Sequence, residues 1–103
     1  MDPASLLPEP VLRRFCAKWR VRKLEVFGSA ARGELRPGSD LDLLVTFDED
    51  ARWGIFEHME MQDELSVLAG RPVDLVSRRA IERTKNEYRR RLILGQAKPL
   101  YAA

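Results

Sequence analysis

The chain has 103 residues, of which 45% are hydrophobic and 33% charged, with a formal net charge of +2 at pH 7. This length suits one domain over residues 1–103, because two independent cores would each be too small to be stable. No apolar run approaches the roughly 20 residues that span a bilayer, the opening residues lack the pattern of a signal peptide, and the single cysteine excludes an intramolecular disulfide. We therefore expect a cytoplasmic protein without membrane contact.

Hydrophobic periodicity and the positions of glycine and proline predict alternating helices and strands. In chain order these are a helix over 8–20, a strand over 23–27, a short helix from Ser29 through Arg32, a strand over 41–47, a helix over 53–69, a strand over 73–76, a helix over 79–94 that ends at Gly95, and an edge strand over 98–101. The strand over 41–47 is apolar almost throughout, which is typical of a strand buried on both faces. His58 and Gln62 interrupt the apolar stripe of the helix over 53–69. The alternation predicts an α/β (α+β) fold with a small mixed β-sheet flanked by helices.

Charges are distributed unevenly along the chain. Residues 40–64 hold nine acidic residues and one basic residue, whereas residues 78–91 hold seven basic and two acidic residues. Each segment could be a solvated helix face, and the basic one could alternatively contact an acidic protein or nucleic acid. Tyr88 is the only aromatic residue of the basic segment, so direct binding of nucleic acid, which usually stacks on several aromatic rings, is not expected.

Three aspartates form the most informative pattern. Asp40 and Asp42 are two residues apart at the start of a predicted strand, so their side chains point to the same face. Neighbouring carboxylates repel each other and are costly to bury, but a Mg²⁺ ion, which prefers oxygen ligands, would relieve this cost. If the strand over 73–76 lies alongside, Asp74 joins them in a two-metal site for phosphoryl or nucleotidyl transfer. The alternative is structural: Asp40 would be a turn residue, Asp42 a surface residue on an edge strand, and Asp74 an ion-pair partner of Arg71.

A Gly-Ser pair precedes the aspartates. Gly28 follows a strand, where a missing side chain lets the backbone approach a ligand, and Ser29 begins a helix whose free amides could hold phosphate. Arg32 could reach the same phosphate as a fixed cation or could form an ion pair with Glu34 or with the aspartates. Ser39 is expected to fix the turn before the aspartates, and contact with nucleotide or metal-bound water is the alternative.

The stretch from Gly28 to Val45 resembles the nucleotidyltransferase signature, which is Gly-Ser, ten residues and Asp-x-Asp, and residues 72–76 resemble the strand that carries a third metal carboxylate. The short chain is similar to the minimal nucleotidyltransferase (MNT) antitoxins encoded beside HEPN ribonuclease toxins. The resemblance implies that the Gly-Ser pair holds nucleotide phosphates. It also implies that Asp40 and Asp42 bind two Mg²⁺ ions, and that Asp74 completes the metal shell and helps to deprotonate the attacking hydroxyl.

By this resemblance the expected reaction is transfer of AMP from ATP to a tyrosine hydroxyl of a cognate HEPN toxin, which neutralises the toxin. Two other functions stay open at this point: transfer to the hydroxyl of a small molecule, and neutralisation by binding alone. The Arg-rich last helix is the expected toxin-binding surface. The sequence also leaves room for a homo-oligomer.

Overall fold

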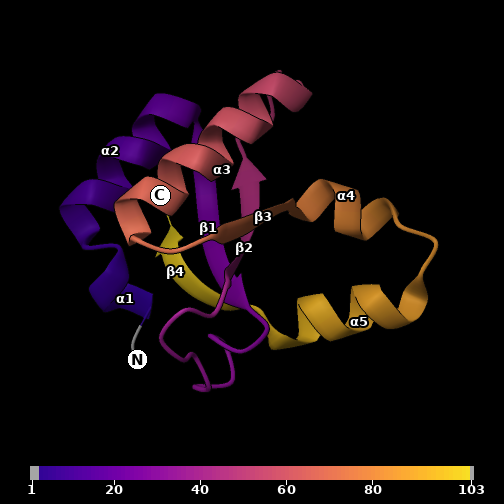
Figure 1. Ribbon diagram of the computed structural model, residues 1–103. Coiled ribbons are helices and arrows are strands. Elements are labelled where there is room, and N and C mark those ends of the chain that lie inside the picture. Colours follow the sequence, from indigo (N-terminus) through magenta and orange to yellow (C-terminus); the bar gives the residue numbers. More distant parts are fainter. Residues whose placement is uncertain (1–2, 103) are drawn as a thin grey trace.

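The computed structural model describes residues 3–102 (Figure 1). Its elements are α1 (Pro3–Leu6), α2 (Glu9–Trp19), β1 (Val21–Phe27), β2 (Leu41–Phe47), α3 (Ile55–Ala69), β3 (Val73–Ser77), α4 (Arg78–Arg83), α5 (Glu87–Gln96) and β4 (Lys98–Ala102). The four strands form one sheet in the order β3-β2-β1-β4. β2 and β3 run parallel, whereas β1 runs antiparallel to both β2 and β4. This mixed sheet with flanking helices confirms the expected fold class.

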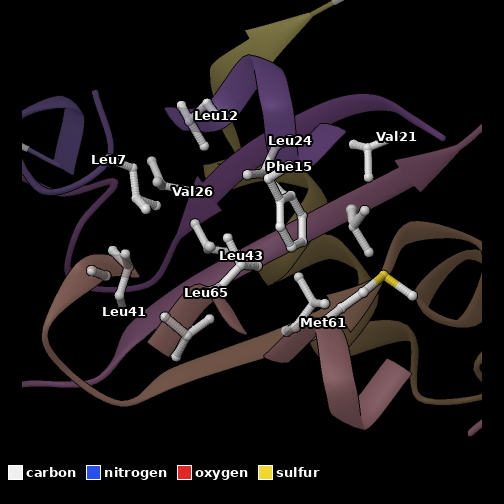
Figure 2. Packing of buried hydrophobic residues seen from close by; sticks show 14 of the residues in the cluster. Leu7, Leu12, Phe15, Val21, Leu24, Val26, Leu41, Leu43, Met61 and Leu65 are labelled. Atoms are coloured by element: carbon white, nitrogen blue, oxygen red, sulfur yellow. The ribbon is translucent and has the colours of Figure 1, made fainter. Parts of the chain in front are cut away.

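Helices α2 and α3 cover one face of the sheet and form the larger core. Leu43 of β2 is fully buried in this cluster, in which Phe15 of α2 and Leu65 of α3 also lie (Figure 2). The buried residues of α2 recur at intervals of three and four, which places them on one side of the helix. Hydrophobic burial on this face therefore fixes the position of the sheet.

The opposite face of the sheet carries a smaller core under α4 and α5. Phe27 and Leu44 of the sheet pack there with Ile81 of α4 and Ile93 of α5. Leu43 and Leu44 are both fully buried although they point to opposite faces, so β2 is buried on both sides, as its apolar sequence predicts. Asp42 shares the face of Leu44, because side chains alternate along a strand.

Polar side chains of α3 close the outer edge of β3. His58, Gln62 and Ser66 lie at intervals of four residues and so line one side of the helix. The His58 Nε2 atom lies 2.7 Å from the Leu75 oxygen, the Leu75 amide donates to Gln62 Oε1 at 2.9 Å, and the Val73 amide donates to Ser66 Oγ at 3.0 Å. The residues that interrupt the apolar stripe thus protect an edge strand from pairing with another chain.

The predicted helix over 79–94 is wrong, because the chain forms two helices separated by residues 84–86. The Thr84 hydroxyl accepts a hydrogen bond from the Asn86 amide at 3.3 Å, and the Asn86 side chain accepts one from the Arg89 amide at 3.0 Å and caps α5. Such local side-chain bonds compete with continuous helical bonding. The expected end at Gly95 is also wrong, since α5 continues to Gln96.

No helix within residues 3–102 has both the length and the apolar character needed to cross a membrane. The predicted edge strand over 98–101 is present as β4, at the sheet edge opposite β3. The chain thus forms one sheet between two unequal cores, and the smaller core lies on the face that carries Asp42.

Candidate active site

Parallel pairing of β2 and β3 brings two of the three aspartates side by side. Asp42 is the register partner of Asp74, and on its other side it pairs with Phe27 of β1. Asp40 precedes β2 and is exposed to solvent. Within residues 3–102 none of the three carboxylates forms an ion pair, so the alternative partner for Asp74 is not found. Arg71 instead donates to the main-chain oxygens of Arg36 and Ser39, at 3.0 and 3.2 Å.

The electrostatics of the site centre on Asp42. Partial burial raises the pKa of this carboxyl, the negative charges of Asp74 and Asp40 raise it further, and the Arg32 guanidinium lowers it. The site therefore disfavours the ionised carboxylate that it needs for ligand binding, and a cation would reverse this preference.

Whether these residues suit a metal ion can be tested on the chemistry of their side chains. Across the described part of the chain, no three His, Cys, Asp or Glu side chains already form a compact metal-binding group. Mg²⁺, however, keeps several water ligands and is usually held by one or two carboxylates together with substrate phosphates. Asp42 and Asp74, which are register partners, fit such a hydrated ion, and Asp40 is near enough for its charge to act on Asp42.

Gly28 brings the main chain directly against Asp42. Its φ angle is +66°, and a Cβ atom built on it would lie 2.3 Å from Asp42 Oδ2. Only glycine combines this left-handed conformation with so close an approach. The sequence predicted that the missing side chain of Gly28 makes space for a phosphate. The structure shows that this space is occupied by the carboxylate of Asp42.

The predicted helix from Ser29 through Arg32 is reduced to hydrogen-bonded turns. The amides of Ala31 and Arg32 both donate to the Gly28 oxygen, at 3.1 and 3.2 Å, and the Glu34 amide donates to the Ser29 oxygen at 2.8 Å. Gly33, with φ of +73°, follows at once and lets the chain turn away.

Two amides at the start of this turn, those of Ser29 and Ala30, donate to no acceptor within residues 3–102. Ser29 is partly exposed, whereas Ala30 is buried. Amides of this kind at the start of a helical turn are suited to anions. The local geometry is therefore compatible with phosphate binding even though the helix itself does not form.

Arg32 and Ser39 have structural partners. Arg32 Nε donates to Glu34 Oε2 at 3.1 Å, and its Nη1 donates to Gln96 Oε1 at 3.5 Å. Ser39 accepts a hydrogen bond from the Arg36 amide on its Oγ at 3.2 Å, so it fixes the turn before Asp40 as expected. Contact of Arg32 or Ser39 with nucleotide stays a prediction.

Sequence reasoning missed Glu25, a buried charge on the same face of the sheet. Its carboxylate accepts a hydrogen bond from Arg78 Nη1 at 2.7 Å and lies 3.6 Å from Lys23 Nζ. The pair with Arg78 joins β1 to the start of α4. The only local signal is an acidic residue between Leu24 and Val26, which alternation alone assigns to the surface.

Comparison with known proteins agrees with this geometry. The model of the nucleotidyltransferase domain family matches residues 9–98. A solved structure described as a candidate minimal nucleotidyltransferase is 37% identical, superposes with a TM-score of 0.72, and the match covers 97% of each chain. A toxin–antitoxin complex solved with AMP-PNP has the same fold, with a TM-score of 0.63 and 24% identity over 94% of this chain and 75% of that chain.

Among relatives compared by sequence, the protein adenylyltransferase MntA of Thermococcus cleftensis is 37% identical over 65 residues. The match covers 63% of this chain and 64% of MntA, which is just under two thirds of that relative's length. The family model covers most of the chain, and the structural match covers nearly all of it. The chain belongs to the nucleotidyltransferase domain family.

Proposed function

We propose that this chain is a Mg²⁺-dependent adenylyltransferase that transfers AMP from ATP to a tyrosine hydroxyl of a cognate HEPN ribonuclease toxin and thereby neutralises it. The observation that carries the proposal is the pairing of Asp42 with Asp74 in adjacent parallel strands, with Gly28 held against Asp42. Two adjacent carboxylates without an ion-pair partner in the described chain have no stabilising role, because their mutual repulsion opposes folding.

The similarities support the nucleotide and the partner. The relative MntA is named a protein adenylyltransferase, and a complex with the same fold is a toxin–antitoxin pair that binds AMP-PNP. The protein acceptor, its tyrosine and the HEPN class of toxin belong to the proposal.

Each residue has a distinct task in the proposed reaction. The turn that begins at Gly28 binds the phosphates of ATP through the Ser29 and Ala30 amides. Asp40, Asp42 and Asp74 would hold Mg²⁺, which when bound neutralises phosphate charge and orients the reacting groups. Asp74 lies on the edge strand and accepts the proton of the incoming hydroxyl. The tyrosine oxygen then forms a bond to the α-phosphorus of ATP while the bond to pyrophosphate breaks.

Replacement of Asp42 by asparagine tests the proposal. Asp42→Asn keeps the shape of the side chain but removes a charged ligand, so we expect a folded protein that no longer transfers AMP. Asp63→Asn is the matched control, because Asp63 is exposed on α3, outside the site. Mass spectrometry of the HEPN toxin from the same genome detects the AMP adduct. Equal modification by wild type and Asp42→Asn would refute the assigned role of the carboxylates.

A further inference from the structure

We propose that the arm formed by α4, residues 84–86 and α5 is the surface that docks the acceptor protein. The inference rests on the proposed function, because it concerns the protein that receives AMP. The arm extends away from the rest of the molecule (Figure 1). Its C-terminal end lies beside the candidate active site, where Gln96 of α5 contacts Arg32.

The arm is connected to the site at its C-terminal end and by the strand that precedes it. α4 follows directly after β3, the strand that carries Asp74. At the other end, Gln96 of α5 accepts a hydrogen bond from Arg32, in the turn that follows Gly28. Because Ile81 and Ile93 pack against Leu44, the arm lies on the face of the sheet that carries Asp42, and a protein docked on it lies on that face.

An ion pair with a buried carboxylate holds the arm in place. Arg78, the first residue of α4, donates to the buried Glu25 carboxylate at 2.7 Å. Ile81 of α4 and Ile93 of α5 pack into the smaller core. The arm is thus anchored to the sheet at its base, and the surface that it presents has a defined position relative to the aspartates.

The outer surface of the arm combines apolar and basic groups. Tyr88 and Leu92 are 77% and 43% exposed and lie one helical turn apart on α5. Exposed basic residues accompany them on the arm: Arg79, Arg83, Lys85, Arg89 and Arg91. Exposed aromatic and arginine side chains are typical of protein interfaces, where arginine pairs with carboxylates and its stem covers apolar area. The arm therefore fits an acidic protein surface with an apolar depression.

Other exposed apolar residues are in the wrong place for the acceptor. Phe56, Met59 and Val67 are exposed on α3, the helix that covers the face of the sheet opposite Asp42. A partner docked there would not reach the carboxylates. Nucleic acid is a less suitable partner for the arm. Proteins that bind single strands stack several bases on aromatic side chains, and the basic segment 78–91 has one aromatic residue.

The test is the double charge reversal Arg89→Glu with Arg91→Glu. Both side chains are exposed, so the variant is expected to fold. Titration calorimetry with the purified HEPN toxin from the same genome should show a dissociation constant raised by about tenfold or more. Transfer of AMP to tyrosinamide, a small acceptor that needs no docking surface, should stay within about twofold of wild type. The matched control is Arg14→Glu, an exposed arginine of α2, which should change neither quantity.

A second pair of variants tests the apolar contact. Tyr88→Ala should weaken toxin binding, whereas Val67→Ala, which removes an equally exposed apolar side chain from α3, should not. Unchanged toxin affinity in both arm variants would overturn the docking proposal. It would also be overturned if the wild type bound RNA tightly without a partner, or self-associated, and lost that property in the double reversal. Failure of the wild type to transfer AMP to either the toxin or tyrosinamide would instead refute the proposed function.

Discussion

Replacement of Gly28 by alanine isolates the closest contact of the site. The new Cβ would lie 2.3 Å from Asp42 Oδ2, whereas ordinary contacts of this kind begin at 3.4 Å. The carboxylate must therefore retreat by about 1 Å. A misplacement of about 1 Å costs on the order of 100-fold in rate when a reacting group is involved. We expect kcat/KM for AMP transfer to fall by about that factor.

The same substitution also strains the backbone. A left-handed conformation costs a non-glycine residue roughly 1–2 kcal/mol, which for a domain of this size lowers the melting temperature by roughly 4–16 °C. The variant should therefore still fold at 25 °C. Thermal unfolding followed by circular dichroism, together with kinetics of transfer, separates the two effects.

Gly70→Ala is the matched control for the loss of stability caused by backbone strain. Gly70 has φ of +69°, close to the +66° of Gly28, but a Cβ there would meet nothing within 4 Å. We expect a similar loss of stability and nearly unchanged transfer. If Gly28→Ala transferred AMP at the wild-type rate, or if Gly70→Ala lost as much activity, the contact between Gly28 and Asp42 would not be the cause.

Three further predictions concern ion pairs and charges around the site. Arg32→Gln removes the charge that lowers the pKa of Asp42, so NMR titration of the metal-free protein should show Asp42 ionising at higher pH than in wild type, and an unshifted titration would contradict the assignment. The pKa of Asp42 is raised in the folded state, so its contribution to stability is fully present below the unfolded pKa and is lost as pH rises through the folded pKa. In urea unfolding measured across this pH range, Asp42→Asn should abolish that loss of stability. Persistence of the same pH dependence in the variant would assign it to another group. Arg78→Ala leaves the buried Glu25 without its closest partner and should cost about 3 kcal/mol of unfolding free energy, with faster hydrogen exchange in α4; a cost below about 1 kcal/mol would show that the pair does not anchor the arm.

Much of the sheet could be predicted from the sequence because its signals are local. The strand at 41–47 is apolar on both faces, and its bounds agree with those of β2. The order of the strands is a different matter, because the pairing of Asp42 with Asp74 joins residues far apart in the chain. Periodicity predicts the two strands but not that they lie side by side. Only the resemblance to the nucleotidyltransferase signature indicated that Asp74 lies beside the other aspartates.

The errors come from side-chain bonds that periodicity does not see. The hydrogen bonds of Thr84 and Asn86 divide the last helix, and the bonds of His58 and Gln62 to β3 account for polar residues in an otherwise apolar stripe. Glu25 is buried because Arg78, 53 positions along the chain, reaches it. Such long-range partners can be found only once the fold is known.

The most direct measurement of the central claim uses radiolabelled ATP with the proposed acceptor, a purified HEPN protein from the same genome. Incubation with Mg²⁺ and ATP labelled at the α-phosphate should transfer the label to the toxin, because AMP retains that phosphorus. ATP labelled at the γ-phosphate should leave the toxin unlabelled, and Asp42→Asn should transfer neither label. Label from the γ-phosphate on the toxin, or full transfer of the α-label by Asp42→Asn, would contradict adenylyl transfer through these carboxylates.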